Sequence, residues 1–106
     1  MKLCVTAQGN NLDAPVDPSF GRCRYFLFVD ADTLQFEAVE NPNVHASGGA
    51  GTNSSQLIAS RNVDALLTGA VGPNAARVLA AAGVKVVTRI MGTVRGAVAA
   101  YITGAS

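Results

Sequence analysis

The chain has 106 residues, a length typical of a single domain with a modest core. Apolar residues make up 49% of it, charged residues 14%, and the formal net charge is +1. This balance argues against a nucleic-acid-binding protein and provides no electrostatic attraction to a membrane. Because no apolar run reaches the length of a membrane span or a secretory leader, we expect one cytoplasmic domain over residues 1–106.

The first 40 residues predict three strands and one long loop. Residues 2–7 form a short apolar run, and residues 24–30 contain an aromatic run that is typical of a strand. Residues 34–40 alternate between apolar and polar side chains, and the tight turn before them predicts an antiparallel hairpin. Residues 8–19 contain two prolines and several Asn and Asp residues, which are typical of a loop.

The rest of the chain predicts alternating helices and buried strands. We expect a helix over about 53–61 with Thr52 or Asn53 as its N-cap, and a strand over 63–69. Residues 72–83 predict a second helix, with proline in its first turn and glycine after its end. A strand over 84–88 and a helix over 93–102 follow. The order β-β-β-α-β-α-β-α indicates a small α/β domain with parallel crossovers.

A glycine-rich loop at residues 45–55 precedes the first predicted helix. It holds Gly48, Gly49, Gly51 and the only histidine, His45. Glycine allows a ligand to approach the main chain, and the unpaired N–H groups of a helix N-terminus favour an anion. An exposed linker in front of a capped helix would have the same composition, so both interpretations stay open here.

Two further loops are expected beside this one. Residues 69–74 connect a parallel strand to a helix, and residues 7–19 follow the first strand. Ligands of open α/β sheets bind outside the carboxyl ends of the strands, so the three loops predict one crevice. Arg22 and Arg24 flank Cys23, and either arginine can face this crevice or lie in solvent along the hairpin.

Candidate metal ligands and catalytic groups are sparse. Cys4 and Cys23 lack the spacing of a zinc site, and we expect Cys4 to be a buried core residue. His45 is either a metal ligand or an ordinary polar surface residue. The sequence contains no nucleophile elbow, P-loop or dinucleotide fingerprint. We therefore expect a binding protein and no enzyme activity.

Several short motifs together resemble a known family. They are Phe20-Gly-Arg, Asn41-Pro, Val63-Asp-Ala-Leu-Leu-Thr-Gly-Ala-Val-Gly-Pro-Asn-Ala, Leu79, and Gly83 with Val84-Lys-Val. With these residues the chain resembles the dinitrogenase iron–molybdenum cofactor biosynthesis family from end to end. The resemblance implies a ribonuclease H-like α/β fold, with a mixed five-stranded sheet and helices on both faces.

The resemblance also implies a function. One short member of this family resembles this chain in size and composition, and it holds a molybdenum–copper sulfide cluster noncovalently. The expected cargo is therefore such a cluster or another molybdenum- or iron-containing sulfur cluster, exchanged with a donor or acceptor protein. Alternatives are a small-anion or nucleotide sensor and a regulatory protein-interaction domain.

The resemblance and the loop pattern together give the expected site. Cys23 or His45 would be the metal ligand if the protein supplies one. The expected cluster-binding residues are Arg22, Arg24, His45, Gly48, Gly49, Gly51, Thr52, Asn53, Gly69, Val71, Gly72 and Asn74.

Overall fold

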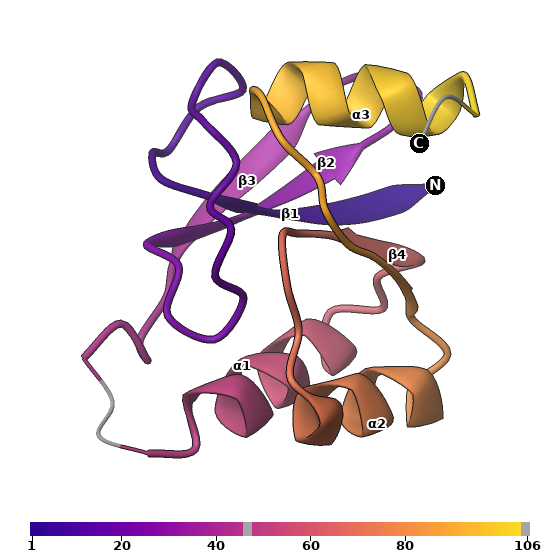
Figure 1. The fold of residues 1–106 in the computed structure, drawn as a ribbon. Helices are drawn as coiled ribbons and strands as arrows, with labels where there is room; N and C mark the ends of the chain where they lie inside the picture. The colour runs from indigo at the N-terminus through magenta and orange to yellow at the C-terminus, as the bar shows by residue number, and fades with distance from the viewer. Residues whose placement is uncertain (46–47, 105–106) are drawn as a thin grey trace.

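The computed structural model describes residues 1–45 and 48–104 and contains the predicted elements in the predicted order (Figure 1). The elements are β1 Lys2–Ala7, β2 Tyr25–Asp30, β3 Phe36–Glu40, α1 Ala50–Ala59, β4 Ala65–Leu67, α2 Pro73–Ala81, β5 Lys85–Val87 and α3 Val94–Ile102. Within the described ranges, no helix is long and apolar enough to cross a membrane.

The five strands form one mixed sheet in the order β3-β2-β1-β4-β5. β2 pairs antiparallel with both β1 and β3, as the short turn between β2 and β3 predicts. β1, β4 and β5 are parallel to one another, so their carboxyl ends meet at one edge of the sheet. The predicted mixed five-stranded α/β fold is confirmed.

Helices cover both faces of the sheet, because successive residues of a strand point to opposite sides (Figure 1). On one face, Leu3 and Val5 of β1 share a core cluster with Val94 and Val98 of α3. On the other face, Cys4 lies in a second cluster to which α1 and α2 contribute Ile58, Leu79 and other side chains. The central strand β1 is consequently buried from Leu3 to Ala7.

The long loop after β1 is anchored at the carboxyl edge by a buried hydroxyl pair. The Thr6 hydroxyl donates to the carbonyl of Asp17 at 2.7 Å, and the Thr68 hydroxyl lies 2.8 Å from Thr6 Oγ1. In return, the Asp17 N–H donates to the carbonyl of Thr6 at 2.8 Å. These bonds hold Pro18 and the residues after it over the ends of β1 and β4, where the sequence placed a crevice.

Several predicted boundaries are wrong. The strands expected at 34–40, 63–69 and 84–88 are shorter, at Phe36–Glu40, Ala65–Leu67 and Lys85–Val87, and the first helix starts earlier than expected. α1 begins at Ala50, so neither Thr52 nor Asn53 is its N-cap; Gly49 takes that position with a φ of 72°. The Asn53 N–H already donates to the carbonyl of Gly49 at 2.9 Å. Thr and Asn favour N-caps in isolation, but buried contacts made by Ala50 and Ser54 favour a helical first turn here. Residues 46–47 of the predicted glycine-rich loop lie outside the described residues.

Candidate functional site

Three loops meet in a surface hollow of about 690 Å³ at the carboxyl edge of β1 and β4. One wall is Pro18–Arg22, the second is Ala50 and Gly51 at the start of α1, and the third is Ala70–Gly72 before α2. We call this site the glycine hollow. The second and third walls come from two of the loops expected at this edge, and the first wall begins in the expected loop 7–19 and extends beyond it to Arg22.

Close backbone contacts hold these walls together. The Ala70 N–H donates to the carbonyl of Pro18 at 3.0 Å. A Cβ atom on Gly69 would lie 2.5 Å from the Pro18 backbone, and one on Gly21 would lie 2.9 Å from the nitrogen of Gly51. Only glycine fits at positions 21 and 69 without a shift of the backbone, so both are required for the shape of the hollow.

The two helices that begin at the glycine hollow lack side-chain caps. Gly49 and Gly72 are the N-caps of α1 and α2, and neither helix has a capping hydrogen bond from a side chain. In α3, by contrast, the Thr93 hydroxyl accepts from the Gly96 N–H at 3.1 Å. First-turn N–H groups have no acceptor within their own helix. The N-termini of both helices border this site and give it partial positive charge, and α1 also contributes the first-turn residues Ala50 and Gly51 to the lining.

The charge of the glycine hollow is positive. Among the described residues that line it, Arg22 is the only charged one. Asp17 is close by in the chain, and one of its carboxylate oxygens accepts from the Ser19 N–H at 2.9 Å. Because one guanidinium and two helix N-termini face the hollow, it favours an anion.

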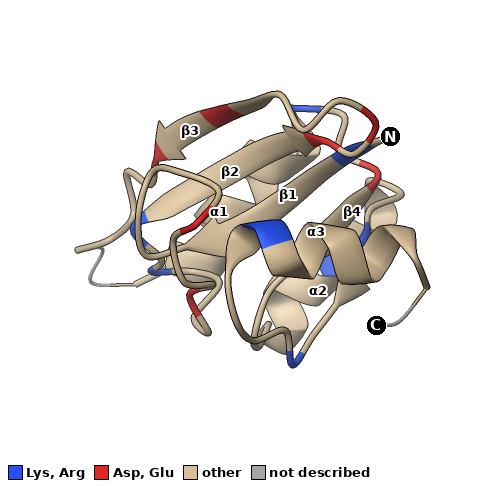
Figure 2. Cartoon of the chain, turned by 90° about the horizontal axis from the view of Figure 1, so that it is seen from above, with Lys and Arg blue, Asp and Glu red and all other residues tan. Residues whose placement is uncertain are grey.

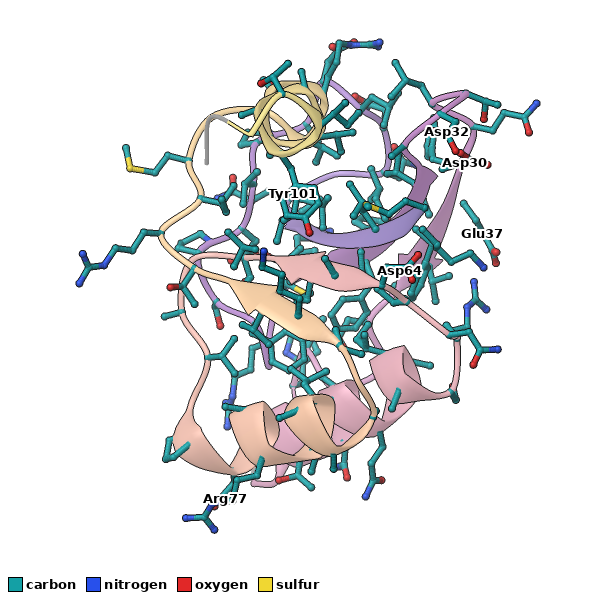
Figure 3. The ribbon with its side chains drawn as sticks, turned by 90° about the vertical axis from the view of Figure 1, so that its right-hand side faces the viewer. Asp30, Asp32, Glu37, Asp64, Arg77 and Tyr101 are labelled. Atoms are coloured by element: carbon teal, nitrogen blue, oxygen red, sulfur yellow. The ribbon has the colours of Figure 1, made fainter. Side chains whose placement is uncertain are left out.

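Acidic side chains gather at the opposite edge of the sheet. Figure 3 shows Asp30, Asp32, Glu37 and Asp64 at the end where β1 and β4 begin, and Asp30 pairs with Lys2 in the sheet register. In Figure 2 the basic residues are spread over separate elements. Arg77 projects from α2 away from the sheet in Figure 3. The positive character of the glycine hollow is thus local.

Arg24 and His45 line a different hollow, of about 610 Å³. Its lining residues come from the start of β2, the end of β3 and the loop after β3. They are Arg24, Tyr25, Glu40, Asn41, Pro42, Val44 and His45. We call this site the histidine hollow. It contains a carboxylate as well as an arginine, so it lacks the uniform charge of the glycine hollow.

Both cysteines are fully buried. Burial raises the pKa of the Cys23 thiol from 9.0 to about 12, and the negative charge of Asp17 adds to the rise. Burial likewise raises the pKa of Cys4 well above its usual value. Metal ligation requires a thiolate, which these environments disfavour. Within residues 1–45 and 48–104, no group of three or more His, Cys, Asp or Glu residues could hold a metal ion.

The structure brings only part of the predicted residue set together. Arg22, Gly51, Val71 and Gly72 line the glycine hollow. Arg24 and His45 line the histidine hollow. The other predicted residues line neither: they are Gly48, Gly49, Thr52, Asn53, Gly69 and Asn74.

Sequence reasoning missed part of the lining. Phe20 and Gly21 lie outside all three expected loops, whereas Pro18, Ser19 and Ala70 lie within two of those loops but were not among the individual residues expected to bind. The Phe20-Gly-Arg motif was the available signal for Phe20 and Gly21, because it leads directly into Arg22. The loops that contain Pro18, Ser19 and Ala70 were expected at this edge, but which residues of those loops line the hollow depends on pairing between distant segments, seen in the bridge between Ser19 and Ala70.

Comparisons with known proteins agree with this architecture. The chain is 44% identical to the orange protein of Desulfovibrio gigas, solved in its apo form, with a TM-score of 0.93 over 98% of this chain and 88% of that chain. It is 35% identical to a putative NifB protein of Thermotoga, with a TM-score of 0.83 over 98% and 89%. An uncharacterized protein of Methanocaldococcus jannaschii is 33% identical over 81% of this chain and 72% of that protein.

The family assignment rests on nearly the whole chain. The family model described as dinitrogenase iron-molybdenum cofactor matches residues 1–104. That range contains every strand and helix of the sheet domain and all three walls of the glycine hollow. The chain belongs to the dinitrogenase iron-molybdenum cofactor family.

Proposed function

We propose that this protein binds a molybdenum-containing metal–sulfide cluster noncovalently in the glycine hollow. The observation that carries the proposal is the chemistry of the lining residues. The described lining residues combine one arginine with two helix N-termini that lack side-chain caps, and they include no carboxylate and no thiol. Such a surface suits an anion that needs hydrogen bonds and charge compensation and does not need metal ligands from the protein.

Different lining residues would make different kinds of interaction with this cluster. Terminal sulfides would accept hydrogen bonds from backbone N–H groups such as those of Gly51 in α1 and of Gly72, the N-cap residue of α2. Arg22 would balance part of the negative charge. Phe20 and Val71 are apolar lining residues that would limit the access of water to the bound sulfide.

Noncovalent binding would also suit a protein that carries the cluster from a donor protein to an acceptor protein. A cluster held by backbone N–H groups and one guanidinium keeps its own metal–sulfur bonds. It can then be received from a donor protein and passed to an acceptor protein without breaking a bond to this chain. The family membership and the apo form of the similar orange protein support a cofactor-binding role.

Anaerobic reconstitution tests the proposal. Purified protein is mixed with tetrathiomolybdate, with and without copper, and passed over a desalting column, with molybdate as the oxyanion control. We expect a visible chromophore and molybdenum to comigrate with the protein after tetrathiomolybdate treatment. Colourless protein without molybdenum would contradict the proposal. Protein that retains molybdate equally well would instead identify a general anion site.

A cysteine variant tests the noncovalent mode. Cys23→Ala removes the thiol adjacent to Arg22, and its fold is checked by circular dichroism. We expect the folded variant to retain the cluster as the wild type does, because the buried thiol does not line the glycine hollow. Loss of the cluster from a folded Cys23→Ala variant would show thiolate ligation.

A further inference from the structure

The Asn41-Pro42 motif contributes no side chain to the glycine hollow, yet Asn41 is one of the few buried polar residues of the protein. Its side chain is 3% exposed and lies at the end of β3. A buried amide requires hydrogen-bond partners for its two N–H groups and its oxygen. The identity of those partners connects this motif to the Phe20-Gly-Arg motif, about twenty residues earlier in the chain.

The Asn41 amide clamps the backbone on both sides of Arg22. Its Nδ2 donates to the carbonyl of Gly21 at 3.1 Å and to the carbonyl of Cys23 at 2.8 Å. Its Oδ1 accepts from the Asn43 N–H at 2.9 Å. Both carbonyls that flank Arg22 are thereby fixed, so the Arg22 backbone has little freedom to rotate.

Ser54 ties the same turn to the first helix. It is fully buried in α1, and its hydroxyl donates to the carbonyl of Gly21 at 3.0 Å. The Asn43 amide nitrogen lies 3.3 Å from the Ser54 hydroxyl oxygen and donates to it. Gly21 also packs against Gly51 so closely that a Cβ atom would lie 2.9 Å from the Gly51 nitrogen. The Arg22 turn is therefore docked on the N-terminal part of α1.

On the basis of the function proposed above, we propose that Asn41 and Ser54 are positioning residues that hold Arg22 over the N-terminus of α1. The clamp brings a guanidinium and a helix N-terminus to one hollow, so both act on the same anion. It also separates Arg22 from Arg24, because the carbonyl of Arg24 accepts from the Asn41 backbone N–H at 2.9 Å. Each arginine then lines a different hollow.

Ser54→Ala tests the clamp, with Ser60→Ala as its matched control. Ser60 is the C-cap residue of the same helix, is exposed, and its hydroxyl donates to the carbonyl of Leu57 at 2.7 Å. We expect Ser54→Ala to weaken tetrathiomolybdate binding about three- to tenfold, the range of one lost hydrogen bond, and Ser60→Ala to leave it unchanged.

A double-mutant cycle with Arg22→Ala separates positioning from general stability. If Ser54 acts through Arg22, Ser54→Ala has no further effect on affinity once Arg22 is alanine. The same fold-change in both backgrounds would overturn the proposal. Asn41→Asp removes both amide donors and is the stronger perturbation, and Ser54→Ala keeps the test valid if Asn41→Asp does not fold.

Backbone ¹⁵N relaxation gives a readout that needs no ligand. We expect greater motion of residues 21–24 in Ser54→Ala than in wild type or Ser60→Ala. Unchanged relaxation at Arg22 would refute the clamp even if tetrathiomolybdate binds. Conversely, if the wild-type protein binds no tetrathiomolybdate while Ser54→Ala shows this loss of order, the proposed function is refuted and the clamp is supported.

Discussion

Arg22 lines the glycine hollow and Arg24 lines the histidine hollow. The two arginines are only two positions apart in the chain, yet the two hollows differ in chemistry. The glycine hollow takes Arg22, two helix starts and no carboxylate. The histidine hollow takes Arg24 together with Glu40 and His45, and its walls come from strands and a loop. The comparison teaches that a nearby arginine is not enough to make a site that favours an anion. The glycine hollow differs from its neighbour in its two helix N-termini and in the proposed clamp on the Arg22 backbone.

The largest expected effect comes from filling the wall of the glycine hollow. Gly69→Ala places a Cβ atom 2.5 Å from the Pro18 backbone, so the loop after β1 must move. We expect the free energy of unfolding to fall by about 3 kcal/mol, the upper range for overpacking. Gly72→Ala is the control, since nothing lies within 4 Å of its Cβ position, and it should cost less than about 1 kcal/mol. Urea unfolding measures the free energy of unfolding of both variants. Equal losses in the two variants would contradict the requirement for glycine at position 69.

Removing each arginine tests the comparison directly. Arg22→Ala should weaken tetrathiomolybdate binding about 10- to 100-fold, because a charged hydrogen bond contributes about 1.5–3 kcal/mol. Arg24→Ala removes the same charge from the histidine hollow and should leave the affinity nearly unchanged. Titration followed by visible absorbance gives both values. If the two variants lose the same affinity, long-range charge and not local geometry governs binding.

The buried Cys23 thiol between the two arginines predicts a loss of stability in alkali. Its pKa is raised from 9.0 to about 12 in the folded protein, so above pH 9 the unfolded chain has fewer bound protons than the folded chain. The contribution of the neutral thiol to the free energy of unfolding is therefore fully present below pH 9. It falls between pH 9 and about 12, by up to about 1.4 kcal/mol per pH unit. Urea unfolding at pH 8 and pH 10.5 should show a steeper fall for wild type than for Cys23→Ala. Identical slopes would show that Cys23 ionises normally.

The smallest effect is expected from capping α2. Gly72 has a φ of −72° and an extended conformation, so Gly72→Asp fits without strain and supplies a carboxylate to the first-turn N–H groups. We expect the folded state to gain a few tenths of a kcal/mol, while tetrathiomolybdate binding weakens several-fold because the carboxylate competes with the ligand. Thermal unfolding measures the expected gain in stability, and a binding titration measures the expected loss of affinity. A Gly72→Asp protein that binds as tightly as wild type would exclude the start of α2 from the site.

Much of the architecture was readable from the sequence. The apolar run at 2–7, the turn at 31–33 and the proline and glycine that flank the second helix are local signals, and each predicted element is present. Parallel crossovers then place the carboxyl ends of β1 and β4 at one edge, so the meeting of three loops there was also predictable.

The tertiary structure alone decided which side chains share a hollow. Thr52 and Asn53 lie inside α1 because the buried Ser54 bonds to Gly21, 33 residues away in sequence. Arg22 and Arg24 line different hollows, and Asn41, which follows β3, bonds to the carbonyls of Gly21, Cys23 and Arg24 around them. Periodicity and turn composition are properties of neighbouring residues, whereas the direction of a side chain depends on partners that only folding brings near. The sequence by itself determined the sheet, its helices and the edge that carries the candidate site, and long-range hydrogen bonds determined which residues line that candidate site.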